Sequence, residues 1–193
     1  MHRRSPFVAA LLASSLLFSA SAGARGAAPA YDVVIRGGTL YDGSGAAPVV
    51  GDIALKGDRI VAVGTVAGSG RTEIDAKGMA VAPGFINMLS WATESLIADP
   101  RSLSDIRQGV TLEVMGEGWS MGPFNATMKA QETERQGDIK YDISWTTLGD
   151  YFAYLEKRGI APNVASFVGA ATVRVHELGE GDVDPTPEQL GRM

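Results

Sequence analysis

The sequence predicts a small β-domain followed by an α/β region that opens a parallel sheet. Residues 31–80 contain short β-branched runs, each closed by Gly, Asp-Gly or Gly-Asp turn residues. After Pro83-Gly84 the pattern changes to alternating apolar strands and helices, which is typical of βα units. The 24 glycines among 193 residues favour tight turns and short strands over a helical bundle.

Bulk composition narrows the class of protein. Hydrophobic content of 45% with 20% charged residues is that of an ordinary globular protein. A formal charge of −5 gives no reason to expect nucleic-acid binding. The sequence contains no phosphate-binding loop, Ser-His-Asp set or Cys/His zinc-finger spacing.

Residues 1–22 have the layout of a signal peptide. A basic start at His2-Arg3-Arg4 precedes an apolar run from Phe7 to Phe18 and a small-residue cleavage site at Ala20-Ser21-Ala22. The run is shorter than the ~20 residues of a spanning helix, so we expect no stable membrane insertion after cleavage, although an uncleaved anchor is the alternative. We expect export to the bacterial periplasm or secretion. Without cysteine, stability must come from the core or from bound metal.

Residues 23–30 are a small-residue linker, and order is expected from Tyr31. The β-domain is expected to be antiparallel, with a hairpin turn at Lys56-Gly57-Asp58-Arg59. Its strands are predicted at residues 32–36, 52–56, 59–63 and 72–75.

Residues 81–193 are predicted to form βα units. The expected strands are 85–89, 110–115 and 163–168. Helices are expected over 100–108, which ends at Gly109, from Thr146 or Thr147 to Arg158, and after a capping box at Thr186 and Gln189. Residues 117–145 are expected to be an irregular insertion with an exposed polar stretch from 129 to 140.

Several segments resemble the opening of the amidohydrolase superfamily. The segments are YDVVIRGGTLYDG (31–43), GDIALKGDRI (51–60), IDAKG (74–78) and APGFI (82–86). Within that superfamily, QGVTLEVMG (108–116) and NVASFVG (163–169) are similar to the D-aminoacylase branch, the N-acyl-D-amino-acid deacylases.

The resemblance implies a composite β-sandwich beside a (β/α)8 TIM barrel. It also implies a divalent metal, usually zinc, that polarises the carbonyl of a small amide substrate and activates water. A barrel needs about 250 residues, and the last predicted helix begins close to Met193. We therefore expect a truncated barrel, an N-terminal fragment of a longer enzyme that is inactive alone.

The first strand end departs from the family pattern. There the resemblance places a His-x-His metal pair after Pro-Gly-Phe-(Ile/Val)-Asp, but this chain has Leu89 and Trp91, which carry no donor atom suited to a metal. Asn87 replaces the family's Asp. It is a candidate substrate-binding residue, and holding the strand end by hydrogen bonds is the alternative.

At the second strand end, the family's Gly-Asn-Cys-Gly-x-Ser carries a zinc-binding cysteine. With one deletion, Glu117 takes the position of that cysteine, followed by Gly118, Trp119 and Ser120. A carboxylate is a legitimate metal ligand, so Glu117 is the candidate ligand. The alternatives for Glu117 are a strand-end carboxylate bound by local amides and a substrate contact. Trp119 and Ser120 are candidate substrate-binding residues, with core packing the default for the tryptophan.

At the third strand end a family histidine is again missing. Arg174 is a candidate to bind a substrate carboxylate, against a structural or surface role. His176, expected in a loop after the strand, is the one histidine outside the predicted signal peptide.

Two functions follow from this pattern. The first is an exported metal-dependent amidohydrolase whose other ligands and catalytic acid lie beyond Met193. The second is an amidohydrolase-fold binding or scaffold protein that has lost catalysis.

Overall fold

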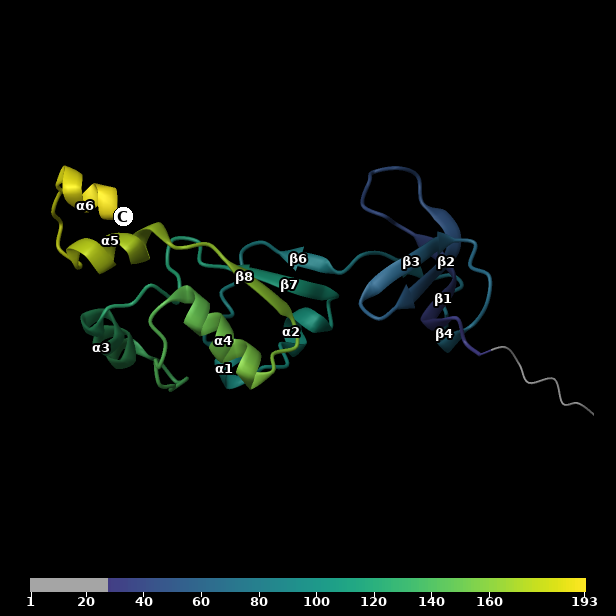
Figure 1. The fold of residues 1–193 in the computed structure, drawn as a ribbon, viewed down its shortest axis with the longest axis horizontal. Coiled ribbons are helices and arrows are strands. Elements are labelled where there is room, and N and C mark those ends of the chain that lie inside the picture. The colour runs from purple at the N-terminus through teal and green to yellow at the C-terminus, as the bar shows by residue number, and fades with distance from the viewer. Residues whose placement is uncertain (1–27) are drawn as a thin grey trace, which may run out of the picture. The chain divides into compact units, whose positions relative to one another are not determined.

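The computed structural model describes residues 28–193, so the predicted signal peptide lies outside the described residues. The chain forms two compact units (Figure 1). The first contains residues 48–80 and the described residues up to Leu40, and the second contains residues 41–47 and 81–193. Each has its own buried core.

The first unit is a β-sheet of strand order β3-β2-β1-β4, with β5 also paired to β1. The pairs β1–β2 and β2–β3 are antiparallel, and the predicted hairpin joins β2 to β3. The strands are β1 (Tyr31–Leu40), β2 (Val49–Lys56), β3 (Arg59–Gly64), β4 (Gly70–Asp75) and β5 (Ala80–Val81).

The expectation of a purely antiparallel β-domain was wrong, because β4 runs parallel to β1. The hairpin turn sets the direction of β3 against β2. No such turn links β1 to β4, since residues 65–69 carry the chain from one edge of the sheet to the other. Turn residues therefore predicted the relative direction of β2 and β3 but not that of β1 and β4.

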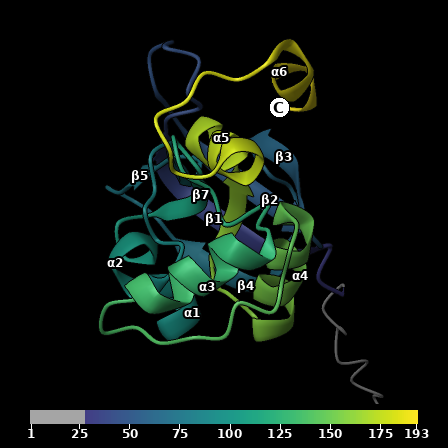
Figure 2. The ribbon, with the colours of Figure 1, turned by 90° about the vertical axis from the view of Figure 1, so that its left-hand side faces the viewer.

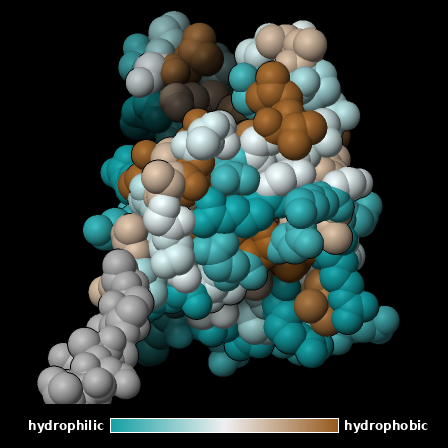
Figure 3. All heavy atoms as spheres, turned by 90° about the vertical axis from the view of Figure 1, so that its right-hand side faces the viewer, coloured by the Kyte–Doolittle hydropathy of each residue, from teal (hydrophilic) through white to brown (hydrophobic). Residues whose placement is uncertain are grey.

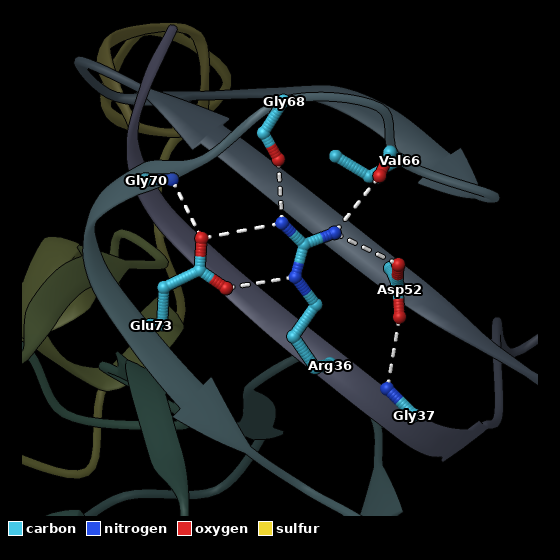
Figure 4. Close-up of polar contacts among 7 residues, drawn as sticks. All are labelled: Arg36, Gly37, Asp52, Val66, Gly68, Gly70 and Glu73. Carbon is cyan, nitrogen blue, oxygen red and sulfur yellow. Dashed lines mark hydrogen bonds and ion pairs between the residues drawn. The ribbon is translucent and has the colours of Figure 1, made fainter. Parts of the chain in front are cut away.

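Arg36 on β1 joins several parts of this sheet (Figure 4). Its guanidinium donates to both carboxyl oxygens of Glu73 on β4 and to Asp52 on β2. It also donates to the carbonyl oxygens of Val66, at 2.8 Å, and Gly68, at 2.6 Å. These bonds tie the 65–69 connection to three strands, while the apolar core beneath consists of Val34, Ala54 and Val66.

The arginine and neighbouring amides favour the ionised carboxylates. The pKa of Asp52 is lowered, first by the hydrogen bond from the Gly37 amide and then by Arg36. The pKa of Glu73 is lowered, first by Arg36 and then by the Gly70 amide. The same contacts raise the pKa of Arg36, so all three groups are charged near neutral pH.

Apolar side chains remain exposed on β2 and β3 of this sheet. In the face drawn in Figure 3, apolar groups lie among polar ones. The exposed large residues on β2 and β3 are Val49, Val50, Ile60, Val61 and Val63.

The second unit is built on a parallel sheet of strand order β6-β7-β8. Strands consecutive in the chain are neighbours in the sheet, and helices lie between them, as βα units require. The elements are β6 (Phe85–Asn87), α1 (Ser95–Ala98), α2 (Leu103–Ile106), β7 (Val110–Met115), α3 (Ala126–Arg135), α4 (Leu148–Arg158), β8 (Asn163–Ser166), α5 (Ala170–Leu178) and α6 (Pro187–Arg192).

The core of this unit is rich in aromatic and methionine side chains. Helices α1 and α4 lie together beside the sheet (Figures 1 and 2). Trp145 is 2% exposed, stacks on Tyr141 and donates to the Met121 carbonyl at 2.8 Å. The cluster consists of Leu96, Ile97, Met115, Met121, Phe124, Met128, Trp145, Tyr151 and Leu155.

Three local expectations need correction. The 117–145 insertion contains helix α3, because Asn125 caps its first turn and Met128 anchors it in the core. That helix is otherwise polar, so its apolar periodicity is weak. The helix expected over 100–108 is shorter, since Ser102 has a φ of 44°, outside the right-handed helical region. His176 lies in α5 rather than in a loop.

Two predicted helices appear with the expected caps. Thr147 and Asp150 form the capping box of α4, which ends at Gly159, and Thr186 and Gln189 form that of α6. In residues 28–193, no helix combines the length and apolar character that crossing a membrane requires.

Candidate functional site

The carboxyl ends of β6, β7 and β8 lie along one edge of the parallel sheet. Parallel strands in consecutive order place these ends together. The turns after the strands are residues 88–91, 116–120 and 167–169. The second turn contains the candidates Glu117, Trp119 and Ser120, whereas Asn87 ends β6 and Arg174 lies on α5.

The turns after β7 and β8 approach each other closely. A Cβ at Gly116, whose φ is 85°, would collide with Phe167, and a Cβ at Gly169 would collide with the backbone of Gly118. The Ala171 amide at the start of α5 donates to the Gly118 carbonyl at 2.9 Å. Only glycine at 116 and 169 allows this approach, which brings Glu117 near the β8 end.

A cavity of about 50 Å³ lies between the turns after β6 and β7. Glu117 shares it with Trp91, and both side chains are exposed. The cavity is lined by Ser90, Trp91, Thr93, Gly116, Glu117, Trp119 and Met121.

The walls of this cavity are anchored to the core. Tyr151 on α4 donates its hydroxyl to the Thr93 carbonyl at 2.9 Å. Burial raises the pKa of Tyr151, so the phenol stays protonated and remains a donor. Trp119 is half-buried and packs against Phe124, with ring centroids 6.4 Å apart.

Asn87 and Ser120 are engaged in local hydrogen bonds. The Asn87 side chain accepts from the Leu89 amide at 3.2 Å and donates to Asp105 at 3.3 Å. The Ser120 hydroxyl donates to the Gly122 carbonyl at 2.6 Å and accepts from the Gly169 amide at 3.0 Å. Both residues hold the strand-end turns in place, and their contact with a substrate stays a prediction.

Arg174 lies on α5 and points toward the segment after that helix. Its guanidinium donates to the carbonyls of Gly181, at 3.2 Å, and Val183, at 2.9 Å. Neither Arg174 nor His176 lines the cavity beside Glu117. The prediction that Arg174 binds a substrate carboxylate is untested, and these contacts show a structural use of the side chain.

The donor set for a metal is incomplete. Among residues 28–193, no three His, Cys, Asp or Glu side chains lie close enough to hold an ion together. Glu117 is the one carboxylate in the cavity lining, and Trp91 and the exposed Leu89 carry no metal donors. The side chains present therefore do not by themselves form a metal centre.

Glu113 is a buried polar residue near the strand ends that was not among the predicted site residues. It lies on β7 and is 0% exposed. Its carboxyl oxygens accept hydrogen bonds from Ser90 at 2.6 Å and Ser102 at 2.7 Å. The sequence signal for a structural role was a glutamate between Leu112 and Val114 in an otherwise apolar strand, because a buried carboxyl group needs hydrogen-bond partners.

The chain belongs to the class of proteins that combine a β-domain with βα units. Its candidate site lies at the carboxyl ends of the strands of those units. No family model matches the chain. It is 38% identical over 146 residues to an N-acyl-D-aspartate deacylase of Alcaligenes xylosoxydans xylosoxydans, covering 75% of this chain and 29% of that protein. It is 30% identical over 168 residues to a D-aminoacylase of the same organism, covering 84% and 34%.

Solved structures agree with these matches. The chain superposes with a TM-score of 0.70 on the N-acyl-D-glutamate deacylase of Bordetella bronchiseptica, which was solved with zinc and a phosphonate inhibitor. The match is 28% identical and covers 84% of this chain and 34% of that one. A D-aminoacylase described as defining a novel subset of amidohydrolases gives a TM-score of 0.69 at 29% identity, with the same coverage.

The chain is therefore a homologue of the N-acyl-D-amino-acid deacylases and D-aminoacylases of the amidohydrolase superfamily. This confirms the resemblance found in the sequence. The chain spans about a third of the length of these relatives.

Proposed function

We propose that this chain is the N-terminal part of an exported metal-dependent amide hydrolase of the N-acyl-D-amino-acid deacylase type. The observation that carries the proposal is the similarity to deacylases over 75–84% of the chain, in both sequence and structure. The described strand ends support it, because they meet at one edge and place Glu117 in a cavity there. Export rests on the signal-peptide pattern of residues 1–22.

The three-stranded sheet is proposed to be the opening of a (β/α)8 barrel. Within the described residues, β6 and β8 each pair on one side with β7, so each has a free edge. Apolar side chains on these strands and the turns after them are also exposed, as expected where further strands would pack. They are Phe85, Ile86, Met88, Leu89, Trp91, Phe167 and Val168.

In this proposal Glu117 is the ligand that the chain contributes to a single divalent metal, with zinc the expected ion. The remaining ligands and the acid that protonates the leaving amine would come from outside residues 28–193, because the described donor set is incomplete. Bound metal would supply polarisation of the amide carbonyl and activation of water. Trp91 and Trp119 would form apolar walls beside the substrate.

The alternative function is an amidohydrolase-fold binding or scaffold protein. One observation favours it: Leu89 and Trp91 leave the first strand end without metal donors. In that function, the two tryptophans that line the cavity would contact a bound small molecule rather than a substrate.

Metal content and hydrolysis separate the two functions. We expect the polypeptide extended beyond Met193 to bind a divalent metal and to release amino acid from N-acetyl-D-aspartate or N-acetyl-D-glutamate, whereas the L-enantiomers serve as the stereochemical control. The 193-residue chain alone is expected to be inactive. Glu117→Ala should lower metal affinity and activity by about 100-fold or more, because losing a ligand should cost more than the ~10–100-fold lost when a group that only orients a ligand is removed. Glu134→Ala, at an exposed position on α3, should change neither.

An extended protein without metal or hydrolysis would favour the binding function. Activity that is unchanged by Glu117→Ala would remove Glu117 from the proposed site.

A further inference from the structure

We propose that Glu113 is a positioning residue that fixes the turn after β6 against β7 and so forms the wall of the strand-end cavity. This inference goes beyond the proposed function, on which it rests only for the chemical role of the cavity. Glu113 does not line the cavity itself, and it acts through Ser90.

The first step is the double attachment of Ser90 to β7. The Ser90 amide donates to the Val114 carbonyl at 2.8 Å, and its hydroxyl donates to the Glu113 carboxyl at 2.6 Å. The same hydroxyl accepts from the Ala92 amide at 3.2 Å. Because strand β6 ends at Asn87, these bonds continue the attachment of this segment to β7 beyond the paired strand.

The segment that Ser90 attaches to β7 forms one side of the strand-end cavity. Ser90 and Trp91 line one side of it, and Gly116 and Glu117, which follow β7 directly, line the other. Glu113 therefore connects the two sides through one side chain. Loss of its hydrogen bond to Ser90 should let the 89–92 turn move relative to Glu117.

The second carboxyl oxygen of Glu113 is also held by a serine. It accepts from the hydroxyl of Ser102 at 2.7 Å. Ser102 precedes α2 and is the one non-glycine residue with a positive φ in residues 28–193. Because both carboxyl oxygens have a serine donor, a glutamine amide at this position would offer a donor where one serine needs an acceptor.

Amide hydrogen exchange and NMR spectra of the 193-residue chain test this role directly. We expect Glu113→Gln to speed exchange of the Ser90 and Ala92 amides and to shift the resonances of the Trp91 indole and the Glu117 amide. Exchange in the interior of α4, at Tyr154 and Leu155, should keep its original rate. Glu134→Gln makes the same substitution at an exposed position and is the matched control.

Two further variants keep the test valid if Glu113→Gln does not fold. Ser90→Ala should give the same local changes, whereas Ser90→Thr keeps the hydroxyl and should restore slow exchange. A double variant, Glu113→Gln/Ser90→Ala, should exchange no faster at the Ser90 amide than Ser90→Ala alone, because the hydroxyl that Glu113 holds is already absent in that variant.

The proposal is overturned if the Ser90 and Ala92 amides keep their rates, or if exchange in α4 rises to the same extent as in the turn. The second result would mean a general loss of stability. Neither readout depends on metal or hydrolysis, so failure of the proposed function and failure of this inference are separate outcomes.

Discussion

Individual residues at the strand ends serve mainly to hold the turns together. Asn87, Ser90 and Ser120 each form hydrogen bonds within the chain, so their polarity is explained without a substrate. Glu117 is different, since its side chain is exposed in the cavity, and its proposed role as a metal ligand would need further donors. Leu89 and Trp91 carry no metal donors, so Glu117 is the one carboxylate in the lining of the cavity.

At the residue scale, Ser102 offers a test of stored backbone strain. A serine with a φ of 44° costs about 1–3 kcal/mol, and its bond to Glu113 offsets part of that cost. We expect Ser102→Ala to lower the free energy of unfolding by about 1–2 kcal/mol, because the bond is lost and the strain remains. Ser102→Gly should lower it less, because glycine adopts this conformation freely. Urea unfolding measures both, and an alanine variant as stable as the glycine variant would contradict the strain.

At the scale of elements, local signals decided several helices and failed for others. The capping box at Thr147 predicted the start of α4, since that pattern satisfies backbone amides without help from the rest of the fold. Helix α3 was missed because it is almost entirely polar and is held by Asn125 and the buried Met128. The predicted direction of β4 was wrong for a related reason, because no local turn sets the direction of β4 relative to β1.

Thr147 gives the prediction at this scale. Its hydroxyl accepts from the Asp150 amide at 3.1 Å, and the Asp150 carboxyl accepts from the Thr147 amide at 2.9 Å. We expect Thr147→Ala to lower the free energy of unfolding by about 1 kcal/mol, because an amide at the start of α4 loses its acceptor. Thr147→Ser should retain most of the stability. Thermal and urea unfolding provide the measurement, and equal effects of the two substitutions would argue against the cap.

At the scale of the whole molecule, the chain consists of two units with separate cores. All three tryptophans, at positions 91, 119 and 145, belong to the second unit. Tryptophan emission therefore reports on that unit. Circular dichroism includes the sheets of both units, so a circular-dichroism transition that tryptophan emission does not follow reports on the first unit.

This difference allows a pH prediction for the first unit. The folded pKa values of Asp52 and Glu73 lie below their ordinary values of 3.8 and 4.5. A lowered folded pKa contributes stability that is complete above the ordinary value and is lost as pH falls through the folded value. Below about pH 4.5 we expect the urea midpoint of the circular-dichroism transition that tryptophan emission does not follow to fall as these groups protonate. Arg36→Met should weaken that pH dependence. A midpoint that is independent of pH in this range would contradict the role given to Arg36.

The sequence by itself determined the main strands of both units, helix α4 and the resemblance to D-aminoacylases, because turn residues, caps and motif spacing are local features. It also located Glu117 at the end of a strand. Tertiary structure decided which of these residues meet. The glycines at 116 and 169 matter through close approach of distant backbone, and Glu113 matters through two serines 11 and 23 residues away in the chain. Such contacts depend on packing between elements, and local sequence does not encode them.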